Sequence, residues 1–206
     1  TVRRRAASQA PAPALKPQLT AANLEFYLSD DGIAYIRPGL KIKVNSITIG
    51  SDRKPVVELT LTDDMDQPLD RLGKTTPGVI SVSMILAAYD PATRHYTSYT
   101  TRVKTTPATS PRPNVSAVQA SADSNGTWTD LQTGTAKYVF RTVLPAGFDQ
   151  TRTTTLGIYA TRNLTDILGK NYYANVEHDF RPDGQKVTEK WDKMRDASTC
   201  LNCHDP

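Results

Sequence analysis

The chain has 206 residues, of which 38% are hydrophobic and 22% are charged, and its formal net charge is +4. This composition is typical of a folded domain with a core of its own, and it excludes disordered and membrane chains. No apolar run reaches the length of a transmembrane helix. No basic stripe with interleaved aromatic residues suggests a nucleic-acid partner, so none is expected.

The first 22 residues are predicted to form an extended arm, because Pro and Ala dominate them. The basic cluster Arg3–Arg5 is followed by Pro- and Ala-rich sequence and not by an apolar segment, so no intact signal peptide is recognised. Since the chain begins with Thr1, we expect a processed N-terminus or a fragment of a longer chain.

Residues 23–182 are predicted to form a β domain, because apolar and polar residues alternate repeatedly there. The expected strands are 24–28, 41–44, 47–49, 56–62, 79–89, 95–103, 136–143, 153–161 and 171–180. In the strand 56–62 the side chains of Val57, Leu59 and Leu61 are predicted to point inward. The alternation changes phase at residues 45–46, which predicts a β-bulge.

The order of these strands predicts the architecture. Residues 79–89 are the most apolar run and are expected to form a central strand, paired with 95–103 in a hairpin. A turn is expected at residues 30–32, and residues 105–127, rich in Pro, Ser, Thr and Ala, are expected to form a long surface loop. Short strands at this spacing favour an all-β fold, an antiparallel Greek-key sandwich or barrel of immunoglobulin-like type. Residues 183–206 are then a short connector, helical within 187–197.

The end of the chain carries the clearest chemical signal. Cys200, Cys203 and His204 form the pattern Cys-x-x-Cys-His, the attachment site of a c-type haem. Each thiol adds to one vinyl group of the porphyrin, and the histidine that follows lies under the iron as its proximal ligand. We therefore predict haem c bound to the two cysteines, with His204 as the iron ligand.

The two cysteines have three other interpretations. A thioredoxin-like thiol–disulfide oxidoreductase needs a helix N-terminus after a strand, whereas residues 190–196 are charged and helix-like. A zinc site needs four ligands, and the spacing to His95 or His178 matches no known zinc knuckle. A disulfide between Cys200 and Cys203 would close a very small ring and add little stability. Haem attachment is favoured over all three.

Other candidate ligands have structural alternatives. His178 shares a strand face with Val176 and Phe180, so it is either the distal haem ligand or a histidine at the edge of the core, and the second is favoured. Met84 is expected in the core, and Met65 and Met194 are less favoured sixth ligands. The aspartates of residues 63–70 resemble a calcium loop but lack the glycine and the closing glutamate of an EF-hand, so a turn is favoured.

Several short segments of the sequence resemble those of a known protein family. They are residues 33–40, 75–81, 145–149, 157–164 and 200–205. Through them the sequence resembles the N-terminal domain and first haem motif of the outer-membrane decahaem c-type cytochromes, the OmcA/MtrC family, and especially its acidobacterial-like members. The resemblance implies a haem-free β-barrel before a multihaem domain, and export to the periplasm or the outer cell surface. It also implies extracellular electron transport with other cytochromes or redox-complex subunits as partners.

The resemblance favours an electron carrier and not an enzyme, with iron as its redox metal. Because the family continues with more Cys-x-x-Cys-His motifs after the first, we expect this chain to be a fragment, or its haem to be enclosed by a partner subunit. The alternative function is that of an accessory β-sandwich, a binding or structural subunit of a membrane redox or photosynthetic complex, with an incidental terminal haem. An exposed sheet edge or apolar patch would favour that alternative.

Overall fold

The structure is a computed structural model that describes residues 19–132 and 134–190. Two helical turns come first, η1 (Leu24–Tyr27) and α1 (Asp30–Ile36), and a third, α2 (Thr165–Leu168), lies between the last two strands. The strands are β1 (Lys41–Ile49), β2 (Pro55–Thr62), β3 (Ile80–Asp90), β4 (His95–Ser98), β5 (Thr101–Thr105), β6 (Ser116–Ala120), β7 (Thr127–Gln132), β8 (Thr135–Val139), β9 (Thr154–Leu164) and β10 (Lys170–Phe180).

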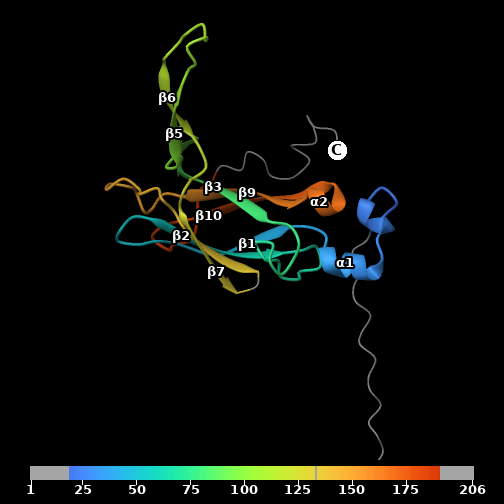
Figure 1. Cartoon of the computed structure of the whole chain (residues 1–206). Helices are drawn as coiled ribbons and strands as arrows, with labels where there is room; N and C mark the ends of the chain where they lie inside the picture. Colours follow the sequence, from blue (N-terminus) through green and yellow to red (C-terminus); the bar gives the residue numbers. More distant parts are fainter. Residues whose placement is uncertain (1–18, 133, 191–206) are drawn as a thin grey trace, which may run out of the picture.

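Eight of the described strands form two antiparallel sheets that pack face to face (Figure 1). Their strand orders are β1-β2-β8-β7 and β10-β9-β3-β4. Lettered along the chain with β4 as C′, these orders are A-B-E-D and G-F-C-C′, the arrangement of immunoglobulin-like sandwiches. The predicted all-β, antiparallel sandwich is therefore confirmed. β5 and β6 form a separate two-stranded ribbon that projects from the body in Figure 1.

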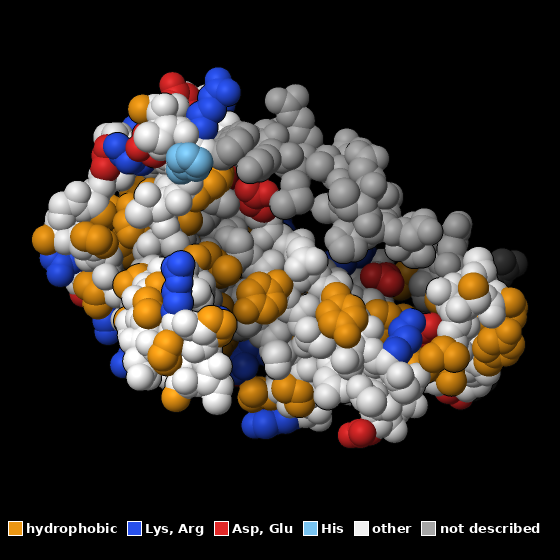
Figure 2. All heavy atoms as spheres, turned by 90° about the horizontal axis from the view of Figure 1, so that it is seen from above, with side chains coloured by type: hydrophobic (Ala, Val, Ile, Leu, Met, Phe, Trp, Pro, Cys, Tyr) orange, Lys and Arg blue, Asp and Glu red, His pale blue; other side chains and the backbone are white. Residues whose placement is uncertain are grey.

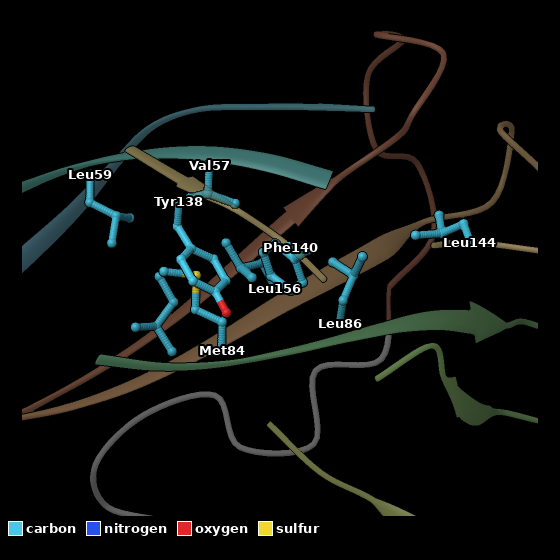
Figure 3. Close-up of a cluster of buried hydrophobic side chains, with 9 residues drawn as sticks. Val57, Leu59, Met84, Leu86, Tyr138, Phe140, Leu144 and Leu156 are labelled. Carbon is cyan, nitrogen blue, oxygen red and sulfur yellow. The ribbon is translucent and has the colours of Figure 1, made fainter. Parts of the chain in front are cut away.

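The core lies between the two sheets and comes from their inward-facing side chains. It is formed by Val57, Leu59, Met84, Leu86, Tyr138, Phe140, Leu144, Leu156 and Ile158 (Figure 3). β2, β3 and β9 each contribute alternate residues, because successive side chains point to opposite faces. The inward set predicted for β2 is confirmed, since Val57, Leu59 and Leu61 are at most 1% exposed.

Two finer predictions of register are also confirmed. The pairing of β1 with β2 shifts between Val44 and Ser46, which is the predicted bulge. β3 pairs with β9 on one side and β4 on the other, so it is a central strand as its apolar sequence indicated.

The strand predicted at residues 24–28 is wrong, and the turn expected at 30–32 is the start of a helix. Ser29 caps α1 by accepting a hydrogen bond from Gly32 N at 3.2 Å, and Asp30 and Asp31 occupy the first turn, where the helix dipole favours acidic groups. In η1 the carboxylate of Glu25 is buried, whereas the apolar side chains of that turn are exposed. The segment has no strand partner, so the alternation in its sequence does not reflect pairing.

The hairpin of 79–89 with 95–103 is only partly correct. β4 pairs with β3 but ends at Ser98, because the buried hydroxyl of Thr100 accepts the hydrogen bond of Leu86 N at 3.1 Å and the chain leaves the sheet there. The predicted loop 105–127 contains β6, which returns along β5 with Val103 opposite Val118. The pairing of β6 with β5 forms a strand in this segment although its composition is typical of a loop.

One buried cation joins the helical turns to the sandwich. The side chain of Arg162 in β9 is fully buried, and its guanidinium donates to the carbonyl oxygens of Ile36, Arg37, Gly39 and Pro77 at 2.5–3.1 Å. Burial lowers the pKa of Arg162 from its usual value. These bonds satisfy the carbonyl groups at the end of α1, which have no intrahelical partner.

Candidate functional site

The predicted haem-attachment residues Cys200, Cys203 and His204 lie outside the described residues. The structure describes the chain that leads to them. After β10 the chain turns at Gly184, where φ is 75°, and Asp183 N donates to Gln150 O at 3.1 Å. Arg181 and Asp183 form an ion pair across this turn.

The segment after the turn returns to the sheet it has just left. The hydroxyl of Thr153 donates to the carbonyl of Glu189, and Lys190 Nζ lies 3.4 Å from Asp179 Oδ2. The other oxygen of Asp179 accepts from the hydroxyl of Thr155 at 2.6 Å. Asp179 and Thr155 point to the side of the sheet opposite the core, so the chain reaches residue 190 on the outer face of β9 and β10.

The connector was predicted to be helical within residues 187–197. Its described part, up to Lys190, has no helix, and that part of the prediction is wrong. The local reason is that the carbonyl of Glu189 and the ammonium of Lys190 are engaged with the sheet. The remainder of the predicted helix lies outside the described residues.

His178 lies on the inner side of β10, opposite Leu156 of β9. Its ring is stacked on Phe180 with centroids 6.4 Å apart, and Val176 and Phe180 pack against the core from the same face. His178 also borders a hollow lined by residues 177–179, 186–188 and 190. The face predicted for His178 is therefore correct, and the geometry supports the edge-of-core interpretation better than a ligand facing outward.

The other described histidine is far from His178. His95 begins β4, which is one edge of the sheet β10-β9-β3-β4, whereas His178 is on β10 at the opposite edge. Three strand spacings separate the two edges, about 14 Å. His178 and His95 therefore cannot bind one metal ion together. Met84 is 2% exposed in the core, as predicted.

The aspartates of residues 63–70 are engaged by the backbone. Asp63, which is 2% exposed, accepts hydrogen bonds from Met65 N and Gln67 N at 2.9 and 2.8 Å. Asp70 accepts hydrogen bonds from the backbone N–H groups of residues 72, 74 and 75. Burial raises the pKa of Asp70, but these hydrogen bonds together lower it by more, so the pKa lies below the usual value. Across residues 19–132 and 134–190, no three His, Cys, Asp or Glu side chains group as metal ligands.

A hollow beside this loop is lined in part by the paired side chains of Arg71 and Asp130. Arg71 donates through two nitrogens to both oxygens of Asp130 at 2.7 and 2.8 Å, and its guanidinium lies 4.6 Å from the ring centroid of Trp128. Such a bidentate pair holds β7 to the turn before β3. This hollow serves the fold and offers no free charge from that pair to a ligand.

Sequence reasoning missed a glycine in the middle of the central strand β9. Gly157 stands between Ile85 of β3 and Glu177 of β10, in strands that pair without any register shift. Its φ is not positive, and a Cβ built on it would have only Ile85 O nearby, at 4.0 Å. Neither the backbone nor the described packing requires a glycine at this position.

Around Gly157 the outer face of the sheet is open. Tyr159 is 49% exposed and Tyr173 is 69% exposed, and both point to this side. Figure 2 views the molecule from this side and shows hydrophobic side chains that stand apart from one another near the middle of the visible surface. We call this surface the outer face; it consists of Ser83, Ile85, Gly157, Tyr159, Tyr173 and Glu177.

Comparisons with known proteins show which solved structures have a similar fold. No family model and no curated protein matches the chain. Among solved structures, the fold is similar to part of the outer membrane decaheme cytochrome OmcA. The TM-score is 0.58 at 17% identity, over 82% of this chain and 26% of that one. MtrC from Shewanella baltica OS185 aligns at a TM-score of 0.49 with 18% identity, over 80% of this chain and 26% of that one.

The likeness to OmcA shows that the two chains share a β-sandwich fold, and at this identity it shows the fold alone. The present chain spans about a quarter of the OmcA chain. In the described ranges, no helix is both long and apolar enough to cross a membrane.

Proposed function

We propose that this chain is the β domain and first haem-binding segment of an electron-transfer c-type cytochrome. The observation that carries the proposal is the pattern Cys200-x-x-Cys203-His204 in a chain whose sandwich has the fold of part of a decaheme cytochrome. The motif alone predicts the cofactor, and the fold supports the same class of protein from independent evidence.

Each proposed site residue has a separate role. Cys200 and Cys203 would hold the macrocycle through two thioethers, and His204 would be the proximal ligand. Haem c, when bound, supplies an iron that takes up and releases one electron. The sandwich would anchor this segment through Glu189 and Lys190, so its task is to position the haem and not to convert a substrate.

The cellular setting belongs to the same proposal. A c-type haem and the fold shared with an outer-membrane cytochrome support export to the periplasm or cell surface. The partners would be other haem segments or redox proteins, to which electrons pass by tunnelling. We also propose that residues 1–22 are an arm, 23–182 the domain and 183–206 the connector.

A second candidate function is that of an accessory binding subunit of a membrane redox complex. The ribbon of β5 and β6 favours it, since all ten of its strand residues are exposed. Val103 and Val118 face the same side and are 67% and 69% exposed. A two-stranded ribbon without a buried face is only marginally stable in water, which favours a partner for it.

The test is to produce the chain in the periplasm with the haem-attachment machinery and to record a pyridine haemochrome spectrum and the intact mass. We expect one haem c per chain of 22.6 kDa, and its loss in the variant with both Cys200→Ala and Cys203→Ala. Thr199→Ala is the matched control that leaves the motif intact. Two titratable thiols and no Soret band would overturn the electron-transfer proposal and leave the accessory function.

A further inference from the structure

Glycine at position 157 lowers the stability of the strand, and nothing in the described chain requires a glycine there. A glycine inside a strand loses more backbone entropy on folding than other residues and has no side chain to pack. Within strands it typically marks a bulge, a bend, or a place where a ligand or another backbone comes close. The unshifted pairing of β9 excludes a bulge. A close approach from outside the sheet is then an explanation that agrees with the exposed position of this part of the sheet.

The path of the described chain, up to Lys190, indicates a candidate for this approach. Thr153 and Asp179 hold Glu189 and Lys190 against the outer side of β9 and β10. Gly157 is opposite Glu177, two residues along β10 from Asp179, which is about 7 Å. The chain therefore leaves the described part on the same side of the sheet as Gly157 and close to it.

We propose that the outer face is the docking surface of residues 191–206, and that the missing side chain at Gly157 lets this haem-bearing segment contact the sheet. The inference rests on the proposed function, because it takes Cys200 and Cys203 to carry haem. Tyr159, two residues along β9 from the glycine, and Tyr173, opposite Thr161, lie on the same exposed surface and then supply aromatic contact to the segment.

The length of the connecting chain permits this docking. Nine residues separate Lys190 from Cys200, and the ten steps of an extended chain between the two reach at most about 35 Å. This is similar to the length of β10, so Cys200 can lie over any part of the outer face. Because the segment is tethered on this face, its effective concentration there favours it over a separate molecule.

The experiment compares the haem-loaded full chain with its Gly157→Val variant. Valine suits a central strand and meets no described atom closer than 4.0 Å from its Cβ, so the sandwich is expected to fold at least as well. Gly147→Val is the matched control, because a Cβ there meets nothing within 4 Å and lies in a loop. Hydrogen–deuterium exchange of peptides from residues 191–206 is the readout, with urea unfolding as a check on the fold.

We expect Gly157→Val to raise the exchange rate of residues 191–206 by about tenfold or more, since protection reports the population of the open state. Gly147→Val should leave the rate unchanged. Equal rates in all three haem-loaded proteins, or an unprotected segment in the original chain, would overturn the docking while the haem spectrum upholds the proposed function. A chain without a Soret band would instead overturn the proposed function, and the inference with it.

Discussion

Glu25 and Tyr172 lie 147 positions apart in sequence and are joined by a hydrogen bond from the tyrosine hydroxyl to the carboxylate. Lys170 Nζ contacts the same carboxylate oxygen at 2.5 Å, while the other oxygen is buried without a partner among the described residues. This cluster fixes η1 to the beginning of β10. It explains why Glu25 is 2% exposed in a turn whose apolar residues face water.

The first prediction is an acid-dependent stability that originates at Glu25. Burial raises the pKa of Glu25, but the hydrogen bonds from Lys170 and Tyr172 together lower it by more. The pKa of Glu25 in the folded state therefore lies below the usual value. The stabilisation is therefore present above the unfolded-state pKa, near 4.3, and is lost as the pH falls through the folded-state pKa. We expect Glu25→Gln to cost about 1–3 kcal/mol at pH 7 and to flatten the pH dependence below pH 5.

The measurement is urea unfolding from pH 3 to pH 7. Glu58→Gln is the control, because Glu58 points outward on β2. It should change neither the stability at pH 7 nor the slope. Parallel pH profiles for Glu25→Gln and the original chain would contradict the assigned role of Glu25.

The second prediction concerns Arg162. Lysine at this position keeps the charge but has its three donors on a single nitrogen, so it cannot make the five hydrogen bonds that Nε, Nη1 and Nη2 of the guanidinium make together. We expect Arg162→Lys to lower the stability by about 3 kcal/mol and Tm by about 6–12 °C. Thermal unfolding followed by circular dichroism tests this, with exposed Arg152→Lys as the control. A loss below about 1 kcal/mol would show that the carbonyl groups find other partners.

The parts of the fold that were predictable depend on local patterns. Val57, Leu59 and Leu61 alternate with polar residues along β2, and period-two alternation is a direct consequence of strand geometry. The phase change at Asn45 likewise shows in the sequence and in the register. The helix α1 was predictable in principle from Ser29 followed by two aspartates, but a glycine three residues later favoured a turn.

Other features depend on groups that are distant in sequence. The carbonyl partners of Arg162 lie 85 to 126 positions away, and nothing near Arg162 indicates them. Gly157 becomes informative only when its neighbours Ile85 and Glu177 show that no described atom needs the space. The proposed haem motif is different, since the prediction rests on the spacing of Cys200, Cys203 and His204 and needs no knowledge of the fold.

The third prediction is that Tyr138 ionises only at high pH. Burial, and then the hydrogen bond from its hydroxyl to Asp123 at 2.8 Å, raise the pKa of Tyr138 to about 12. Its neutral form stabilises the fold fully below the unfolded-state pKa, near 10, and this contribution is lost as the pH rises through the folded-state value. In an ultraviolet titration, we therefore expect Tyr138 to ionise near pH 10 in the unfolded chain but not in the folded chain.

Tyr138→Phe removes this late-ionising group and also the acceptor of Gly126 N at 3.1 Å. We expect it to cost about 1–2 kcal/mol, because Asp123 keeps the hydrogen bonds from Arg141 N, Thr142 N and the hydroxyl of Thr142. An exposed tyrosine, Tyr27, provides the control as Tyr27→Phe. If Tyr138→Phe left both the stability and the high-pH titration unchanged, the hydrogen bond to Asp123 would have no energetic role.

The last prediction distinguishes the two interpretations of His178. Its ring lies on the core side of β10 against Phe180, whereas the chain that leads to Cys200 passes on the other side at Asp179. We therefore expect His178→Phe to leave the spin state of the haem unchanged in electron paramagnetic resonance and visible spectra. His204→Ala, in contrast, should remove the proposed proximal ligand and alter both spectra. Conversion of His178→Phe to a high-spin haem, with His95→Phe unaffected, would instead assign His178 as the distal ligand and place the haem at the edge of the sandwich.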